Sequence, residues 1–417
     1  MAWQASPRRA SAARSTDLTK QVSAAELRRF LLDRLGLAGH LRPADEAAAL
    51  AADLAMIQID SIRVTGLRNH ELAWLARSEA SVADFYAMLY ERHEFRETHY
   101  PVFAVRRDWV PTLSHGMPDI RPASKRTRRR MLPLMQQIED QIRSQGPMAP
   151  SHFESRRVRG GFNTIKSTTR ALEYLFSDRR VQISGRTQHF HRLFDVSERA
   201  LPELAAWTAP AKAEYEHFLM RSALQVLKVA TAEQWADRVA LHYGAWRGES
   251  IKRWRSLVER EAPKAARPVK VSGLPDEPTY WYLPEDEVGW KSAAGAFEKD
   301  HPARVIPPLD NLLFNRKRFS ALFGLDYKFE AYTPLHQRRY YFAMPMIHGD
   351  SLVAMLDAKK AGHEWRIVGF EQLAPAPVEA LRGAIHRLAR YAGCTKVTAS
   401  ARLPREVRKA VVGKVAQ

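Results

Sequence analysis

Hydrophobic and polar positions in the first part of the chain follow helical spacing and then strand alternation. Ser23 and Glu26 form a capping-box pattern ahead of an apolar stripe at helical spacing. Segments 43–54 and 69–77 predict two further helices, and the aromatic and β-branched residues that follow predict strands. Helices followed by a β-hairpin are typical of a winged helix, a frequent nucleic-acid binding module. We therefore expect a first winged helix over residues 23–115.

The same order of patterns returns twice further along the chain, without repeated sequence. Residues 147–201 predict short helices and a hairpin that turns near Gly185, and residues 202–284 predict the same order again. Between the first two winged helices, residues 116–146 begin with a run of arginines and continue with an amphipathic pattern. This segment predicts a basic linking helix.

The pattern changes in the last third, where aromatic and aliphatic residues alternate between turn residues. Turns at His348-Gly349-Asp350 and Ala361-Gly362 separate strand-like segments, and a helical pattern follows. Residues 285–395 therefore predict a small antiparallel β-barrel with one helix, between a disordered basic tail at 1–22 and a basic tail at 396–417. The predicted fold class is α+β, with three tandem winged helix-turn-helix domains followed by a C-terminal antiparallel β-barrel.

Composition adds a partner class to this picture. The 417 residues, enough for roughly two to four domains, carry 65 Lys and Arg against 46 Asp and Glu, a net charge of +19. A chain this basic attracts polyanions, nucleic acid first among them, although charge alone leaves anionic membrane surfaces open. No apolar run approaches the roughly 20 residues that cross a bilayer. The one cysteine, Cys394, excludes an internal disulfide and any multi-cysteine metal site, which fits a reducing cytoplasm.

The strongest candidate for chemistry is an acid and an amide two residues apart in an apolar run. If residues 56–62 are extended, Gln58 and Asp60 face one way, while Ile57, Ile59 and Ser61 face the other. A carboxylate beside a carboxamide can orient a water molecule and take its proton, or stabilise positive charge that develops on a sugar. The alternative is that a Gln-x-Asp triplet caps a helix or solvates a turn.

Candidate DNA contacts come from the second predicted winged helix. Lys166, Thr168 and Arg170 lie near the start of its second helix, where a recognition helix meets the DNA backbone or the bases, and Arg186 lies on its hairpin. His189 and His191 also lie on this hairpin, but no third ligand is nearby, so we expect no metal site.

Several motifs together resemble those of the YcaQ/AlkZ family of bacterial DNA glycosylases, over about residue 25 to about residue 390. The resemblance rests on Gln58-Ile59-Asp60, Arg68, His70, Arg77, Pro308-Leu309-Asp310-Asn311-Leu312-Leu313, Asn315-Arg316-Lys317-Arg318, Tyr332-Thr333-Pro334 and Arg338. Proteins of this family consist of three tandem winged helices and a C-terminal β-barrel. They excise bulky N-alkylated purines, and some unhook interstrand crosslinks.

The resemblance implies roles for individual residues. Gln58 would position the attacking water, and Asp60 would act as the base or stabilise the oxocarbenium-like sugar. Arg68, His70 and Arg77 would contact phosphates or support Asp60. The full set of implied or pattern-based DNA contacts is Arg68, His70, Arg77, Lys166, Thr168, Arg170, Arg186, Arg316, Arg318 and Arg338.

The expected partner is double-stranded DNA that carries alkylated or crosslinked purines. We expect a monomer in the bacterial cytoplasm, associated with the nucleoid, that needs no cofactor and no metal. Because no lysine lies in the Gln58 motif to form a Schiff base, we expect monofunctional action.

Two observations leave other interpretations open. The segment 352–357 lacks a Gly-Arg pair that relatives carry in the barrel, which leaves the lesion preference undecided. A winged-helix transcription regulator without catalysis would also be basic, and an RNA-binding factor is a weaker third hypothesis. Three different winged helices in one chain favour a monomer that wraps DNA, because a palindrome reader needs only one in each subunit.

Overall fold

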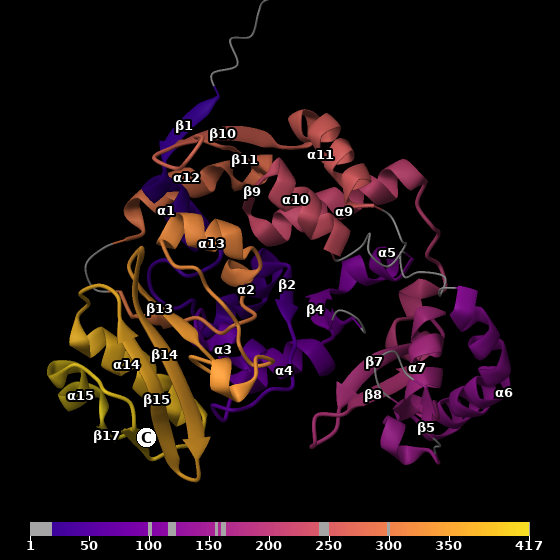
Figure 1. The fold of residues 1–417 in the computed structure, drawn as a ribbon. Coiled ribbons are helices and arrows are strands. Elements are labelled where there is room, and N and C mark those ends of the chain that lie inside the picture. The colour runs from indigo at the N-terminus through magenta and orange to yellow at the C-terminus, as the bar shows by residue number, and fades with distance from the viewer. Residues whose placement is uncertain are drawn as a thin grey trace, which may run out of the picture.

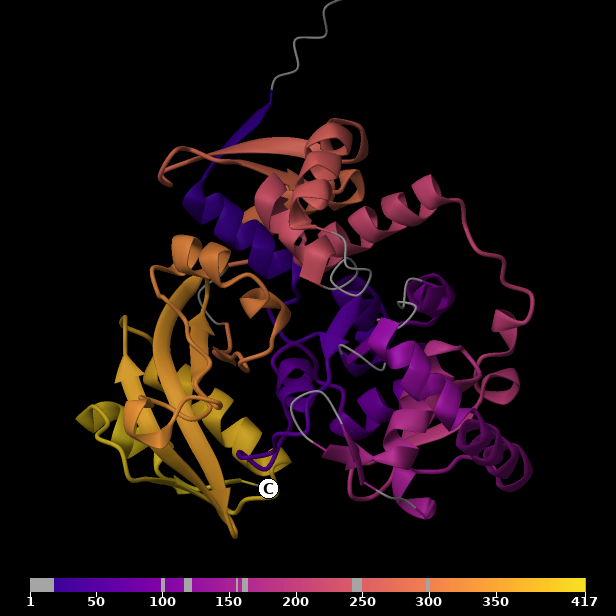
Figure 2. The same ribbon diagram turned by 45° about the vertical axis from the view of Figure 1, so that its right-hand side comes forward.

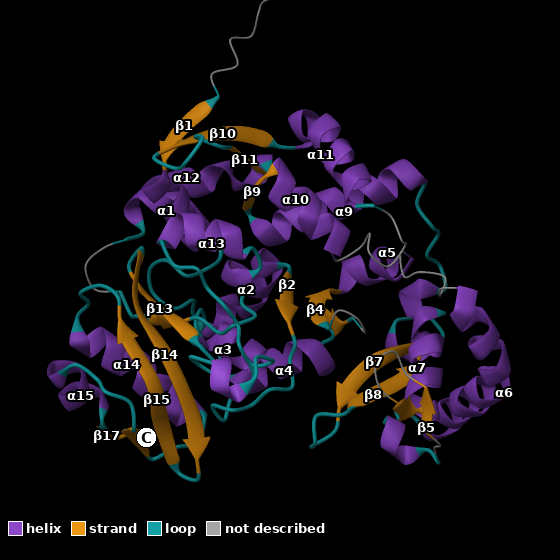
Figure 3. Cartoon of the chain, in the orientation of Figure 1, coloured by secondary structure: helices purple, strands orange, loops and turns teal. Residues whose placement is uncertain are grey.

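The structure, a computed structural model, describes residues 19–98, 102–115, 122–154, 157–159, 164–241, 250–297 and 301–416. It is a mixed α/β fold whose helices and strands form four groups (Figures 1 and 3). We call residues 24–115 the first unit, 122–207 the second unit, 212–297 the third unit and 301–416 the C-terminal unit. Most of the expected basic tail at 1–22 lies outside the described residues, but Lys20–Ser23 forms strand β1.

The first unit has the helices that the sequence predicts. The Ser23–Glu26 capping box is present, since the Glu26 N–H donates to Ser23 Oγ (3.2 Å) and the Ser23 N–H donates to Glu26 Oε2 (2.7 Å). Its strands form a sheet in the order β2-β4-β3, so β2, which ends at Gln58, is an edge strand. The elements are α1 (Ala24–Arg34), α2 (Ala47–Leu54), β2 (Met56–Gln58), α3 (Asn69–Leu75), α4 (Val82–Tyr90), β3 (Phe95–Glu97), β4 (Phe103–Arg106) and α5 (Val110–His115).

The second unit is built on the long helix that the arginine-rich segment predicts. This helix packs against α7 and against a hairpin of two strands, and Met135, Ile138 and Ile142 supply its buried face. The elements are α6 (Pro122–Gln145), β5 (Arg157–Arg159), β6 (Thr164–Lys166), α7 (Ser167–Ser177), β7 (Val181–Arg186), β8 (Arg192–Val196) and α8 (Ser197–Ala200).

The sheet of the third unit includes β1, a strand from near the N-terminus. Strand β1 pairs in parallel with β10, so the sheet order is β1-β10-β11-β9, and Lys20 lies opposite Val269. Phe30 of α1 stacks on Trp290 of α12 with ring centroids 4.0 Å apart. The elements are α9 (Lys212–Leu227), β9 (Val229–Thr231), α10 (Ala232–Val239), α11 (Ile251–Ala265), β10 (Arg267–Ser272), β11 (Thr279–Tyr282) and α12 (Gly289–Gly295).

The C-terminal unit is a curled six-stranded sheet in the order β12-β13-β14-β15-β16-β17. Strands β12 and β17 are its edges, so the described strands form an open sheet where we expected a closed barrel. One pair, β15 with β16, is parallel because helix α14 connects them as a crossover. The elements are β12 (Arg304–Val305), α13 (Arg316–Phe323), β13 (Met344–His348), β14 (Ser351–Ala361), β15 (Glu364–Gln372), α14 (Val378–Tyr391), β16 (Lys396–Ala399), α15 (Arg405–Val411) and β17 (Gly413–Lys414).

The end of the chain is part of this sheet, whereas the sequence predicted a basic tail at 396–417. Val397, Val407, Val411 and Val415 are all buried in the same hydrophobic cluster as α14. Single valines among many basic residues gave only a weak periodic signal. Their burial adds β16, α15 and β17 beyond the expected boundary at residue 395.

The first unit lies in the centre, with the C-terminal sheet on one side, the second unit on the other and the third unit above (Figures 1 and 2). The chain after Asp60 runs along the C-terminal unit, where the Lys360 N–H donates to Val64 O (2.9 Å) and Trp365 Nε1 donates to Thr65 O (3.1 Å). These hydrogen bonds attach the chain that follows Gln58 and Asp60 to the C-terminal unit. Among the described helices, none is long and apolar enough to span a membrane.

Candidate active site

Gln58 and Asp60 lie at the end of the edge strand β2 and share one exposure pattern. Both are partly exposed, whereas Ile57 and Ile59 are buried. This agrees with the alternation that the sequence predicts for these four residues. Ser61 differs from the expectation, because it is exposed and does not share the buried side of Ile59. Strand β2 ends at Gln58, so the chain has already left the extended pairing by Ser61.

Asp60 is held by one hydrogen bond from its backbone N–H and one to a carboxylate oxygen. Oδ1 accepts the Ile62 N–H (2.7 Å), and the Asp60 N–H donates to His70 Nδ1 (3.4 Å). Within the described part of the chain, no hydrogen bond engages Asp60 Oδ2 or the side-chain amide of Gln58. These two groups are therefore available to a water molecule or a substrate.

His70 connects Asp60 to a buried chain of hydrogen bonds. Because Nδ1 accepts from the Asp60 backbone, the hydrogen-bond pattern assigns the ring hydrogen to Nε2, which lies 2.9 Å from the Tyr86 hydroxyl. Tyr86 donates in turn to Glu71 Oε1 (2.5 Å). Burial, and then the charges of Arg186 and Arg68, hold the pKa of His70 well below its ordinary value. The imidazole is therefore neutral, which its role as an acceptor at Nδ1 requires.

Arg68, which directly precedes α3, is the last member of this chain of hydrogen bonds. Glu71 accepts both the Arg68 N–H (2.7 Å) and Arg68 Nη1 (2.9 Å). Burial and the neighbouring Glu71 raise the pKa of Tyr86, so its hydroxyl remains a donor. The Arg68 guanidinium also lies 3.8 Å from the ring centroid of Phe190, which belongs to the second unit.

The second unit reaches this site through the tip of its β7–β8 hairpin. The Phe190 ring stacks on His70 with centroids 5.5 Å apart and planes inclined by 12°. Arg186 on the same hairpin donates to both carboxylate oxygens of Glu97 (2.7 and 2.6 Å), and its guanidinium lies 4.0 Å from the Phe190 centroid. Sequence reasoning missed Phe190, Glu97, Glu71 and Tyr86. No local signal marks a side chain whose partner lies in another unit.

The C-terminal unit fixes the other side of the site through two asparagines. Asn69 Nδ2 donates to Gln58 O (3.4 Å), and Asn69 Oδ1 accepts the Leu309 N–H (2.9 Å). Asn311 Nδ2 donates to Met56 O (2.9 Å) at the start of β2. The Pro308 to Leu313 motif, which is remote in sequence, thus holds the backbone of the strand that carries Gln58.

Arg77 lies in the interior, away from any surface that DNA could reach. It donates through Nη1 and Nη2 to the two oxygens of Asp310 (2.7 Å each), and the two side chains are 1% and 0% exposed. Nε donates to Leu35 O (2.6 Å) and Nη1 also donates to Ala73 O (2.8 Å). The phosphate contact expected for Arg77 does not fit this position, because its donors are already satisfied by protein groups.

Three other expected DNA contacts are also inside the protein. Arg318 is fully buried and donates to Leu227 O (2.6 Å) and to Val229 O, between α13 and the third unit. Thr168 is buried, and its hydroxyl donates to Pro150 O (3.5 Å). His70 is buried as described above. These side chains cannot touch DNA from where they lie, so the direct contacts expected of them are replaced by internal hydrogen bonds.

The remaining candidates differ in exposure. Lys166 and Arg316 are exposed. Arg170 is partly exposed and pairs with Glu173 (2.9 Å). Arg338 is partly exposed, and its guanidinium donates to Thr333 O and Ala331 O. Arg68 and Arg186 lie at the Phe190 contact and are mostly buried. Arg68 and Arg186 are thus gathered around Phe190, which stacks on His70. Among the residues that the structure describes, no contact joins Lys166, Arg170, Arg316 or Arg338 to that cluster.

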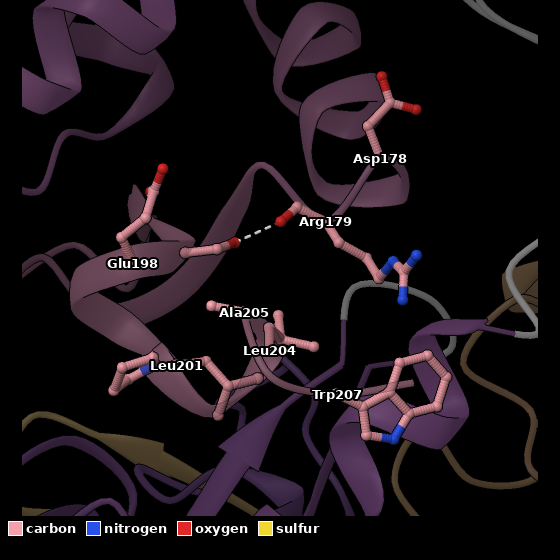
Figure 4. A pocket seen from close by; sticks show the side chains of 9 residues that line it. Asp178, Arg179, Glu198, Leu201, Leu204, Ala205 and Trp207 are labelled. Atoms are coloured by element: carbon pink, nitrogen blue, oxygen red, sulfur yellow. Dashed lines mark hydrogen bonds between the residues drawn. The ribbon is translucent and has the colours of Figure 1, made fainter. Parts of the chain in front are cut away.

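A pocket of about 350 Å³ lies in the second unit and contains neither Gln58 nor Asp60 (Figure 4). Arg179 approaches Trp207 there, 5.4 Å from its ring centroid, and Ser197 Oγ donates to Arg179 O (2.6 Å). None of the candidate catalytic or DNA-binding residues named above lines it. In the described ranges, no group of three or more His, Cys, Asp or Glu is arranged to hold a metal ion.

Comparison with known protein families identifies one class of protein, the DNA glycosylases. A sequence model of the family described as "DNA glycosylase AlkZ-like" matches residues 51–391, which include both Gln58 and the Pro308 to Leu313 motif. The chain therefore belongs to the AlkZ-like DNA glycosylase family, whose enzymes act on N-glycosyl bonds, and the resemblance found in the sequence is confirmed.

One solved structure supports the fold. It is the Streptomyces sahachiroi DNA glycosylase AlkZ, which is similar with a TM-score of 0.56 and 15% sequence identity. The similarity covers 91% of this chain and 99% of that chain. At this identity the comparison establishes a shared fold, and the roles of individual residues have to be argued from the site itself.

Proposed function

We propose that this protein is a monofunctional DNA glycosylase that hydrolyses the N-glycosidic bond of N7-alkylated purines, with Gln58 and Asp60 as its catalytic pair. One observation carries the proposal. Within the described part of the chain, Asp60 Oδ2 and the Gln58 amide make no hydrogen bond, while the first and C-terminal units fix the backbone around them and Phe190 of the second unit packs on His70. A preorganised carboxylate beside a free amide is what water activation at a sugar carbon requires.

The chemistry suits a single carboxylate. Alkylation at N7 places a positive charge on the purine, so the base leaves without being protonated by the enzyme. As the C1′–N9 bond breaks, positive charge develops on the sugar, and the Asp60 carboxylate stabilises it. Water held by the Gln58 amide then forms the new bond to C1′ and gives its proton to Asp60. The products are the free base and an abasic site.

His70 supports this reaction but does not gain or lose a proton in it. Nδ1 accepts the Asp60 N–H and Nε2 donates to Tyr86, so neither nitrogen is free to act as a general acid. Its lowered pKa keeps the imidazole neutral near pH 7. We assign His70 the role of positioning the Asp60 backbone.

Duplex DNA is the partner that the family implies, and the surface candidates for contacting it are Lys166, Arg170, Arg316 and Arg338. We propose that the first three units act as tandem winged helices in a monomer that wraps the duplex, and that the substrates include interstrand crosslinks. The net charge of +19 supports tight binding to the DNA backbone. A bulky lesion resists extrusion from the base stack, so a protein that deforms the duplex around it has an advantage.

The test is release of 7-methylguanine, and separately of an N7-linked crosslink, from duplex DNA. We expect alkali-labile abasic sites with the native protein and a loss of roughly a hundredfold or more with Asp60→Asn. Gln58→Ala should lower the rate less. The matched control is Asp140→Asn, which removes an exposed carboxylate on α6 and should leave the rate unchanged. DNA binding without base release on any of these substrates would favour the non-catalytic regulator.

A further inference from the structure

We propose that Phe190, at the tip of the β7–β8 hairpin, is a positioning residue that completes the active site of the first unit from the second unit. The proposal rests on the proposed function for its activity readout. The hairpin reaches from the second unit toward α4, and its tip contacts the residues around His70 (Figure 1). The site that holds Asp60 is therefore shared between two units.

The partly buried Phe190 ring packs against His70, which holds the Asp60 backbone, and against two guanidinium groups. It stacks on His70 at 5.5 Å, and the guanidinium groups of Arg68 and Arg186 lie 3.8 and 4.0 Å from its centroid. Tyr86, which accepts from His70, contacts the same ring edge-on at 6.4 Å. Cation–π and ring-stacking contacts of this kind favour one ring orientation for each partner. Phe190 thereby restricts the plane of the imidazole that accepts the Asp60 N–H.

The hairpin tip is shaped to present this side chain. Phe190 has a positive φ of 66°, a conformation that an aromatic residue rarely adopts. The turn is held by the Phe190 N–H donating to Thr187 O (2.8 Å) and by Arg186 Nη1 donating to Phe190 O (2.8 Å). A strained residue that the surrounding structure over-determines is a common feature of functional sites.

An ion pair docks the same hairpin where β7 ends, next to the tip. Arg186 and Glu97 are 9% and 0% exposed, and Tyr90 also donates to Glu97. The hairpin is thus attached to β3 through Arg186 and to His70 through Phe190. The Arg186 guanidinium also lies against the Phe190 ring, but its ion pair with Glu97 does not involve that ring. Removing the ring should therefore leave the second unit docked while opening the space beside His70.

Loss of the ring should change the protonation of His70. Burial is the main cause of its low pKa, with Arg186 and Arg68 adding to it, and Phe190 supplies part of that burial. The charged or titratable groups that face this cluster include Asp60, Arg68, Glu71, Tyr86, Tyr90, Glu97, Arg186 and Arg192. Water beside the imidazole would raise its pKa toward the ordinary value of about 6.5. Once protonated at Nδ1, the ring can no longer accept the Asp60 N–H.

The experiment compares single-turnover base release by the full-length native protein, Phe190→Ala, Phe190→Tyr and Leu193→Ala between about pH 5.5 and about pH 8.5. We expect Phe190→Ala to lose roughly tenfold at the upper end and to lose more as the pH falls through about 6.5. Phe190→Tyr keeps the ring and should recover most of the rate. Leu193, half-buried opposite Gly185 on the same hairpin, is the control for destabilisation alone, and Leu193→Ala should keep the native pH profile.

A second readout does not depend on activity. With ¹⁵N-labelled histidine, the His70 signals, assigned by their loss in His70→Asn, should show the neutral Nε2–H form across the pH range in the native protein. They should titrate in Phe190→Ala. If Phe190→Ala fails to fold, Phe190→Leu, which keeps apolar bulk without the ring, takes its place.

The outcomes separate the two proposals. A native pH profile and an unchanged His70 signal in the Phe190 variant would overturn the role of Phe190 and leave the glycosylase proposal standing. If the native protein releases no base, the glycosylase proposal fails. The histidine signals then decide alone whether Phe190 controls the protonation of His70.

Discussion

Arg77 and Asp310 form a two-point ion pair in the interior, joining the end of α3 to the C-terminal unit across 233 positions of sequence. Both oxygens of Asp310 accept from the guanidinium, and Asp310 Oδ1 also accepts the Leu312 N–H (2.9 Å). The same motif supplies Asn311, which holds β2. The pair therefore fixes the distance between the candidate site and the sheet that supports it.

Removing one partner of this pair should destabilise the protein strongly. Arg77→Met leaves the buried Asp310 carboxylate unpaired, and Asp310→Asn leaves the buried Arg77 guanidinium without its counter-charge. Either change costs about 3 to 5 kcal/mol in the free energy of unfolding. The double variant Arg77→Met/Asp310→Leu should recover a large part of that loss. Chemical denaturation measures all three. A single Arg77 variant of native stability with weakened DNA binding would instead support the phosphate contact that the sequence suggested.

The asparagine link to Gln58 allows a test that separates position from stability. Asn69→Asp keeps the acceptor for the Leu309 N–H but loses the donor to Gln58 O, whereas Asn69→Leu loses both. Each lost hydrogen bond of a buried group costs about 1 to 3 kcal/mol. We expect both variants to lower the melting temperature and to slow base release, with Asn69→Asp also destabilised because its buried carboxylate would face the Gln58 carbonyl oxygen. Base release at the native rate in Asn69→Leu would show that Gln58 does not depend on this link.

Local patterns predicted much of the framework. The Ser23–Glu26 cap, the helix that follows it and the buried side of Ile57 and Ile59 all depend on neighbours in sequence, so spacing alone identifies them. The family, too, was evident from the Gln58 motif combined with the motif at 308–313. Roles for Gln58 and Asp60 were predicted and remain proposals, supported by an Asp60 carboxylate oxygen that has no hydrogen bond within the described residues.

Long-range contacts account for what the sequence did not predict. Arg77 and Arg318 carry charges that normally favour the surface, and only partners far along the chain, such as Asp310, explain their burial. Pairing of β1 with β10 depends on a sheet built by the third unit. Nothing in the sequence singled out Phe190 on the predicted hairpin, because its contact with His70 depends on where the second unit docks.

The low pKa of His70 should appear in the pH dependence of stability. The unfolded chain takes up a proton near pH 6.5, but the native protein does not until a lower pH, so the native state loses stability as pH falls below about 6.5. The loss is at most about 1.4 kcal/mol for each pH unit. His70→Leu should remove this component from the acid side of the stability curve. The exposed His189 is the control, because His189→Ala should leave the curve unchanged. An acid side that is identical in native protein and His70→Leu would contradict a neutral His70.

Salt dependence should distinguish surface contacts from buried arginines. Lys166 on the second unit and Arg316 on α13 are exposed, and each is proposed to neutralise one DNA phosphate. Each alanine variant should then weaken duplex binding equally for all sequences and reduce the slope of log K against log salt by about 1. Lys409→Ala is the control, because Lys409 lies on α15 at the outer edge of the C-terminal sheet and pairs with Glu406 (Figure 1). Fluorescence anisotropy over a salt series measures the slopes. If Lys409→Ala changes the slope as much as Lys166→Ala or Arg316→Ala, binding follows overall charge, and the proposed contact surface is wrong.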